Sequence, residues 1–185
     1  MVIVPTPAVS DLAAVVVRRP PVGRVRLVCV DGYSGAGKTQ LAGVLAAALG
    51  GAPVVHLDDI YPGWDGLAAA IPLAVAGVAE PLAAGRAARW RRHDWVADRP
   101  GEWCEVSPAE IVLLEGCGAG AAPLRAFAST VVWVDVPPEV RARRLRARAD
   151  WAGYAPHLRR WARQEDALRA ADLTREHADV VVDNG

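Results

Sequence analysis

The stretch RVRLVCVDGYSGAGKTQLAGVLAAAL, residues 24–49, decides the fold. Its first part is an apolar run typical of a strand covered on both faces, and its last part predicts a helix. Between them, residues 32–39 read G-x-x-x-x-G-K-T, the pattern of a phosphate-binding loop. The glycines let backbone N–H groups surround a phosphate, Lys38 adds a point charge, and Thr39 offers a hydroxyl to Mg²⁺. The stretch therefore predicts a nucleotide-binding protein.

Length and composition bound the class of protein. The chain has 185 residues, 52% hydrophobic and 23% charged, which suffices for one domain with a substantial core. This balance excludes a disordered or collagen-like chain. The 21 basic residues equal the 21 acidic ones, so net charge gives no general attraction to nucleic acid or to an anionic membrane. Lys38 is the one lysine, at a position where a point charge suits phosphate better than a broad guanidinium.

The cysteines and the start of the chain indicate a compartment. Cys29, Cys104 and Cys117 are odd in number and lack metal-ligand spacing, so we interpret them as small buried residues in a reducing environment. Residues 1–10 lack the basic and apolar regions of a signal peptide, and no apolar run approaches the ~20 residues that span a bilayer. We expect a cytoplasmic protein that is a monomer or a homodimer.

Short apolar strands alternate with helices along the chain, which predicts a parallel sheet covered on both faces. Residues 86–106 are rich in tryptophan and arginine and so differ in composition from the rest of the chain. We interpret this segment as a polar hairpin or an irregular insertion. We expect a single domain over residues 1–185. The predicted strands are 24–32, 53–59, 110–116, 130–136 and 178–184; the predicted helices are 8–19, 38–49, 65–84 with an interruption at Pro72, one that begins at Pro137-Pro138, and 157–171.

The acidic pair Asp58-Asp59 narrows the class of nucleotide protein. A GTPase would carry an N/T-K-x-D motif, which a chain with a single lysine in its phosphate loop cannot contain. The strand after the first helix of such a sheet ends near the γ-phosphate. A carboxylate there can accept a proton from an acceptor hydroxyl, whereas helix capping is its ordinary alternative role.

Several segments together resemble the uridine kinase and phosphoribulokinase branch of the P-loop kinases. They are VDGYSGAGKT, HLDDIY, HDWV, LLEG and the arginine-rich helix, within residues 24–183. The resemblance implies a three-layer α/β P-loop NTPase fold: a five-stranded parallel sheet in the order 2-3-1-4-5, helices on both faces, and a small lid. It also implies ATP and Mg²⁺ as cofactors and a small-molecule acceptor, with no nucleic-acid or membrane partner.

The resemblance assigns roles to matching positions. The expected catalytic residues are Lys38, Asp58 as general base, with Asp59 as the fallback, and Arg144. Thr39, Asp58 and Glu115 are expected to hold Mg²⁺ or its water shell. The expected nucleotide-binding residues are Gly32, Ser34, Gly35, Ala36, Gly37, Lys38, Thr39, Gln40 and Arg148. The expected substrate residues are Asp59, Tyr61, Trp64, Asp65, Arg92, His93, Asp94 and Trp95.

The acceptor segments depart from the uridine kinase pattern. A hairpin with Tyr-Asp-Phe-Val closes over the base in that family, and residues 93–96 are similar. The family's uracil-reading histidine has no counterpart in residues 97–99, and the insertion that orients ribose is shortened to residues 64–66. The hairpin tryptophans can stack on an aromatic acceptor or merely pack the hairpin onto the domain. These tryptophans are Trp90, Trp95 and Trp103.

The arginine-rich helix admits two interpretations. Arg141, Arg144 and Arg148 fall on one helical face by their spacing, and with the break that follows they resemble a kinase lid over residues 141–156. Such a lid would bring guanidinium groups to the transferring phosphoryl group and exclude water. The alternative is a solvated helix face. Among the histidines, His56 is expected in the core, and His157 and His177 are expected at the surface.

The predicted function is ATP-dependent transfer of a phosphoryl group to a hydroxyl of a small metabolite, of the uridine- or cytidine-like nucleoside kinase type. One alternative is a kinase of a phosphorylated acceptor such as a nucleoside monophosphate, in which hairpin arginines grip the second phosphate. Those arginines are Arg89, Arg91 and Arg92. The other alternative is a non-enzymatic ATP-binding regulatory protein.

Overall fold

A computed structural model describes the backbone of residues 2–5 and all of residues 9–185. Ala8, the first residue of the predicted helix 8–19, lies outside this range. The strands are β1 (Val2–Pro5), β2 (Arg26–Gly32), β3 (Val54–His56), β4 (Ala88–Asp94), β5 (Arg99–Val106), β6 (Ile111–Glu115), β7 (Ala128–Asp135) and β8 (Val180–Asp183). The helices are α1 (Val9–Arg18), α2 (Lys38–Ala48), α3 (Leu67–Ala74), α4 (Glu80–Ala83), α5 (Ala122–Arg125), α6 (Pro138–Arg146), α7 (Trp151–Tyr154), α8 (Leu158–Asp172) and α9 (Thr174–His177).

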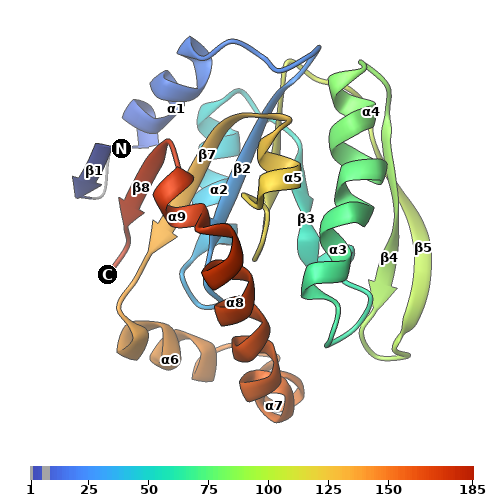
Figure 1. Cartoon of the computed structure of the whole chain (residues 1–185), viewed down its shortest axis with the longest axis vertical. Helices are drawn as coiled ribbons and strands as arrows, with labels where there is room; N and C mark the ends of the chain where they lie inside the picture. Colours follow the sequence, from blue (N-terminus) through green and yellow to red (C-terminus); the bar gives the residue numbers. More distant parts are fainter. Residues whose placement is uncertain (1, 6–8) are drawn as a thin grey trace.

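A parallel sheet forms the middle layer, in the order β1-β8-β7-β2-β6-β3 (Figure 1). The five strands other than β1 are the five predicted strands, and their order is the predicted 2-3-1-4-5. The sheet is one strand wider than expected, because β1 pairs with β8 along its outer edge. A four-residue run that ends in a proline carries too little periodicity to be assigned as a strand from sequence alone.

Strand β2 shows why helices cover both faces of the sheet. Successive side chains of a strand point to opposite faces. Accordingly Val28 and Val30 pack against α1 and α2, whereas Leu27 and Cys29 pack into a second cluster. That second cluster draws buried side chains from α3, α4, α5 and α8. Both faces of the central strand are therefore buried, which explains its nearly unbroken apolar sequence.

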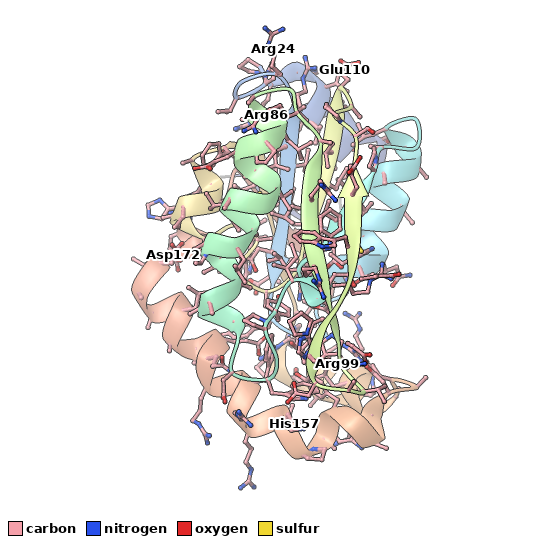
Figure 2. The ribbon with its side chains drawn as sticks, turned by 90° about the vertical axis from the view of Figure 1, so that its right-hand side faces the viewer. Arg24, Arg86, Arg99, Glu110, His157 and Asp172 are labelled. Carbon is pink, nitrogen blue, oxygen red and sulfur yellow. The ribbon has the colours of Figure 1, made fainter. Side chains whose placement is uncertain are left out.

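The segment 86–106 forms an antiparallel hairpin of β4 and β5, separate from the main sheet. Trp90 of β4 is buried, while Trp103 of β5 is 60% exposed. Figure 2 shows the tip of the hairpin, marked by Arg99, at the same end of the molecule as His157. The hairpin thus extends toward the end of the molecule where α7 and α8 meet.

Two predicted interruptions differ in the structure. Helix α3 continues past Pro72, and the irregularity comes later, as a π-helical turn over Val75–Ala79 that leads into α4. The predicted break at residues 153–156 is instead filled by the end of α7 and a 3-10 turn, Ala155–His157. In the part of the chain that the structure describes, no helix is both long and apolar enough to cross a membrane.

Candidate active site

The phosphate-binding loop lies at the carboxyl end of β2, between that central strand and the start of α2 (Figure 1). Helix α2 begins at Lys38, and its N-cap is Gly37, which makes no side-chain capping bond. No acidic residue lies in its first turn. The first N–H groups of the helix, together with the positive end of its dipole, are therefore free to meet an anion.

Two glycines of the loop are required by close approach and by backbone conformation. Gly35 has φ of +79°, and a Cβ there would lie 2.9 Å from the carbonyl oxygen of Arg141. Gly37 has φ of +93°, and a Cβ there would lie 2.6 Å from Nδ2 of Asn184. Side chains at either position would be strained and would push these neighbours away. Glycine at these two positions thus permits the loop to be covered from outside.

The outer carbonyls of the loop are held by side chains from two other segments. Asn184 donates from Nδ2 to the Ala36 oxygen at 2.8 Å, and Arg144 donates to the same oxygen at 3.3 Å. Arg144 also donates to the Asn184 carbonyl at 2.8 Å, while Arg141 lies 3.5 Å from the Ser34 oxygen. With its carbonyls held outward, the loop keeps the concave shape that an anion needs.

Lys38 is buried at the base of the loop. Its ammonium donates to the Tyr33 carbonyl at 3.0 Å and to the Cys117 sulfur at 3.3 Å. Burial acts to lower the pKa of Lys38, but the surrounding acidic groups outweigh it and raise the pKa above its usual value. Those groups are the carboxylates of Glu165, Glu115 and Asp31. The lysine therefore keeps its charge in spite of burial.

Glu115 joins the loop to the neighbouring strands. Its Oε1 accepts the Thr39 hydroxyl at 3.1 Å and Nδ1 of His56 at 2.6 Å. The register of β3 against β6 places His56 beside Glu115, so this histidine is a half-exposed partner of the carboxylate and not the core residue expected. The hydrogen bond to Glu115 is the main cause that raises the pKa of His56.

The oxygen atoms around Thr39 suit a magnesium ion. The described residues contain no cluster of three or more His, Cys, Asp or Glu side chains that could hold a metal ion on their own. Mg²⁺ ordinarily keeps several waters and takes one or two protein oxygens beside substrate phosphates, so such a cage is not required. A hydroxyl at Thr39 and a carboxylate at Glu115 fit that donor set.

Asp58 and Asp59 face different surroundings. Asp58 opens on the cleft, and its carboxylate makes no direct hydrogen bond or ion pair with any residue that the structure describes. Although Asp58 is exposed to the cleft, desolvation by the protein around it and the nearby charge of Glu115 raise its pKa. Asp59 instead accepts from Arg92 at 3.1 Å. Asp58 is thus the carboxylate left available to a ligand.

One cleft of about 890 Å³ brings together most of the predicted site residues. It runs from the phosphate-binding loop past the end of β3 to the tip of the hairpin and to α7. Of the predicted residues it is lined by Ser34, Gly35, Gly37, Lys38, Thr39, Gln40, Asp58, Asp59, Tyr61, Trp64, Trp95, Glu115, Arg144 and Arg148. Gly32 and Ala36 belong to the same loop through their backbones and are buried.

Four predicted substrate residues do not line this cleft in the described part of the chain. Asp65 forms an ion pair with Arg160. Arg92, on β4, forms ion pairs with Asp59 and with Glu102 of β5. The other two belong to the hairpin tip: His93 is buried against Asp98 at 3.1 Å, and Asp94 accepts the N–H groups of Val96 and Ala97. These side chains shape the substrate segments, because each is committed to another part of the protein.

The far end of the cleft is walled by aromatic rings. Trp64 stacks on His157 at 4.2 Å between ring centroids, and it also contacts Trp95 at 4.8 Å and Tyr154 at 5.6 Å. His157 was expected at the surface, and the fold instead places it in this wall. The Trp95 indole donates to the Asp58 carbonyl at 3.0 Å, so the wall adjoins the available carboxylate.

The two predicted lid arginines differ in their partners. Arg144 is bound to loop carbonyls, as described above. Arg148 lies beyond the end of α6, pairs with Asp150 through two bonds of 2.7 and 2.8 Å, and acts electrostatically on Asp58. Arg89 and Arg91 lie over the exposed Trp103 ring. Among the described residues, neither of those two nor Arg92 lines the cleft.

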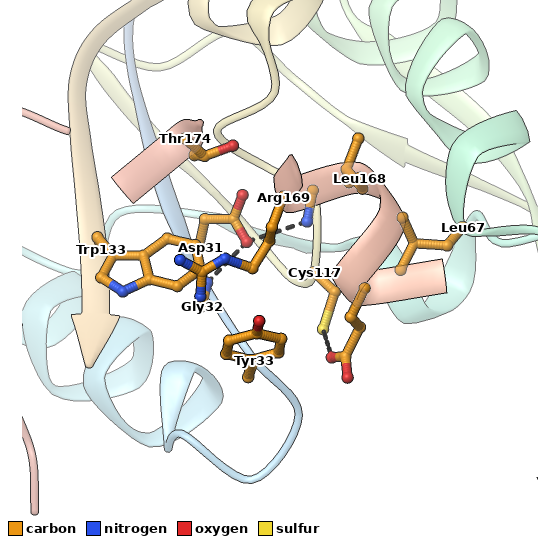
Figure 3. A pocket seen from close by; sticks show the side chains of 11 residues that line it. Asp31, Gly32, Tyr33, Leu67, Cys117, Trp133, Leu168, Arg169 and Thr174 are labelled. Atoms are coloured by element: carbon orange, nitrogen blue, oxygen red, sulfur yellow. Dashed lines mark hydrogen bonds between the residues drawn. The ribbon is translucent and has the colours of Figure 1, made fainter. Parts of the chain in front are cut away.

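Sequence reasoning missed a group of residues beneath the loop. Asp31, at the end of β2, is buried and accepts backbone N–H groups from Gly32, Gly118 and Gly120 at 2.6 to 3.0 Å (Figure 3). It ties the start of the loop to the segment after β6. The others are Cys117, Tyr154, Trp161 and Glu165, from the segment after β6 and from α7 and α8. The spacing of Trp161 and Glu165, four apart on a helix, was the available signal.

Comparisons with known proteins agree with this geometry. Residues 28–153 match the family described as an AAA domain. A solved structure described as a possible uridine kinase from Bacillus stearothermophilus has a TM-score of 0.71 and 22% identity, covering 95% of this chain and 97% of that one. A candidate fructose transport system kinase from a Silicibacter species has a TM-score of 0.59 and 20% identity, covering 95% and 99%. None of the curated proteins matches the sequence.

These likenesses establish the fold. The structural matches share the arrangement of sheet, loop and helices along nearly the whole chain. The family match spans the phosphate-binding loop, the second strand end with Asp58, and the arginine-rich helix. The predicted P-loop NTPase fold is therefore confirmed, and the chain belongs to the AAA-domain family of P-loop proteins.

Proposed function

We propose that the protein transfers the γ-phosphoryl group of ATP to a hydroxyl of a small molecule. The observation that carries the proposal is a single cleft that joins Lys38, the Thr39–Glu115 pair and Asp58, whose carboxylate no described residue engages in a hydrogen bond or ion pair. A phosphate cradle alone would serve a switch or a motor equally well. A carboxylate that faces the same cleft without such a bond is what an acceptor hydroxyl requires.

Each end of the reaction has residues suited to it. The loop N–H groups and Lys38 would hold the phosphates and stabilise charge that develops on them. Asp58 would orient the acceptor hydroxyl and take its proton, and its raised pKa makes it a stronger base than an ordinary aspartate. Mg²⁺, held through Thr39 and by Glu115 through water, would supply neutralising charge on the phosphates.

We propose different roles for the two lid arginines, Arg144 and Arg148. Arg144 would act as a positioning residue, because its guanidinium holds the carbonyls of Ala36 and Asn184. Arg148 is better suited to meet the transferring group, since it lines the cleft and faces Asp58. Arg148 would first have to break its ion pair with Asp150, and closure of a lid would provide such a movement.

The walls of the cleft favour an unphosphorylated, flat acceptor of the nucleoside type. Trp64, Trp95 and Tyr154 offer ring surface, and Asp58 and Asp59 make this end acidic. A second phosphate would have to approach those carboxylates. The arginines proposed for it are held on the hairpin instead, which weighs against the nucleoside monophosphate alternative.

A screen for ATP consumption tests the proposal. Wild-type protein with Mg-ATP is offered nucleosides, nucleoside monophosphates, sugars, vitamins and amino alcohols, and ADP release is measured. We expect a nucleoside to raise turnover above the rate with water alone, and we expect Lys38→Ala to abolish the increase. If no acceptor raises turnover while Mg-ATP still binds, the non-enzymatic regulatory alternative replaces the kinase.

A further inference from the structure

Helix α8 reaches the phosphate-binding loop with two side chains on one face. Trp161 and Glu165 are four residues apart and therefore lie on the same face. The Trp161 indole donates to the Ser34 hydroxyl at 3.1 Å, and Glu165 accepts the backbone N–H of Ser34 at 2.7 Å. The third residue of the loop is thus held by α8, which also lines the acceptor end of the cleft through Trp161.

Glu165 is connected to Lys38 through a thiol. Cys117 donates to Oε1 of Glu165 at 3.0 Å, the bond drawn dashed from Cys117 in Figure 3, and its sulfur accepts from Lys38 at 3.3 Å. Burial raises the pKa of Cys117, so the thiol keeps the proton that it donates. The chain of contacts runs from ammonium to thiol to carboxylate.

A carboxylate in this place has two opposite effects on a bound polyphosphate. Glu165 is only 5% exposed, and its charge, together with those of Glu115 and Asp31, compensates the buried ammonium of Lys38. It also fixes the loop through the N–H of Ser34. The same negative charge, however, lies beside the cradle that is to receive phosphates, and like charges repel strongly where water is scarce.

We propose that Glu165 is a positioning residue and the resident counter-anion of the phosphate-binding loop. It holds Ser34 and, through Cys117, Lys38 in the binding arrangement before nucleotide arrives, and its charge limits how tightly polyphosphate is then held. The proposal rests on the proposed nucleotide-binding function. Limiting the affinity for ADP favours turnover wherever product release limits the rate, as it does in many enzymes.

The contacts and the charge of Glu165 can be separated. Both the Ser34 and the Cys117 bonds end on the same oxygen, Oε1. Glu165→Gln can keep an oxygen there and so keeps both bonds while it removes the charge. Glu165→Ala removes the bonds and the charge together. A carboxylate that was merely structural would give no gain of binding in either variant.

Calorimetric titration with Mg-ADP and with inorganic pyrophosphate, which lacks a base, tests the proposal. We expect Glu165→Gln to bind both about tenfold more tightly than the wild type. We expect Glu165→Ala to bind about tenfold more weakly than Glu165→Gln, because the loop is no longer held. Glu80→Gln, an exposed carboxylate on α4, is the matched control for the change of net charge and should bind as the wild type does.

The outcomes separate this inference from the proposed function. Binding by Glu165→Gln that is equal to or weaker than that of the wild type overturns the inference, and so does an alanine variant as tight as the glutamine one. If thermal unfolding shows that the alanine variant does not fold, the comparison of Glu165→Gln with the wild type decides alone. A wild type that binds neither probe refutes the proposed nucleotide site itself, and the inference falls with it.

Discussion

The two ends of the cleft are built in different ways. At the loop end, a continuous stretch of eight residues supplies the cradle, and its neighbours bind it through backbone atoms: Asn184 and Arg144 hold the Ala36 carbonyl. At the acceptor end, side-chain rings from three distant segments meet, with Trp64 between Trp95 and His157. Backbone contacts leave side chains free to vary around a fixed shape. Ring contacts make the shape depend on the side chains, so specificity can change at that end while phosphate binding persists.

Replacing the loop lysine should give the largest effect. Lys38→Ala removes the positive charge that the loop itself carries, and we expect phosphoryl transfer to fall by about 10³-fold or more. Lys38→Arg is the control, and we expect it to restore little activity because a planar fork does not fit a site made for a point charge. Steady-state ADP release measures both. Full activity in Lys38→Arg would show that the loop end does not require a lysine. It would then contradict the contrast between the two ends of the cleft.

Asp58→Asn should affect the acceptor end alone. Without the base, transfer should drop by about 10²-fold, while the affinity for Mg-ADP stays close to that of the wild type. Asp59→Asn is the matched control, since that carboxylate is paired with Arg92, and we expect a smaller loss. Turnover and calorimetric binding on the same samples separate the two ends. An equal loss in both variants would show that the pair acts through charge alone.

Trp64→Ala should raise KM for the acceptor about tenfold with little change in KM for ATP, because it removes the ring at the centre of the wall. Trp103→Ala, an exposed tryptophan of the hairpin outside the cleft lining, should leave both constants unchanged. Initial rates with each substrate varied in turn test the pair. A rise in KM for ATP in Trp64→Ala would mean that the wall belongs to the nucleotide.

The smallest effect expected is a displacement of the pH profile. Burial and the charge of Glu115 raise the pKa of Asp58, so this group takes up a proton at a higher pH than an ordinary aspartate does. Since the base acts only when ionised, kcat/KM should fall as pH drops through that raised pKa, and Asp58→Asn should lose this acid limb. A limb that persists in Asp58→Asn would assign the titration to another group.

The loop end could be predicted from sequence, and the acceptor end only in part. The motif fixes the loop because its glycines, Lys38 and Thr39 are adjacent in the chain. Trp64 and Trp95 were found through family resemblance, whereas His157 and Trp161 required the packing of α8 against the sheet to be known. His93 and Asp94 do not line the cleft for the same reason: a motif gives the segment but not the direction of each side chain at the hairpin tip.

The distribution of tryptophans gives the protein an internal optical reporter. Three of the seven, Trp64, Trp95 and Trp161, line the cleft, and the indole of Trp161 is bonded to the loop itself. Ligands that enter either end will change the polarity around at least one of these fluorophores. Emission spectra of the unlabelled protein can therefore follow occupancy in real time, and replacement of single indoles would tell which end a compound fills.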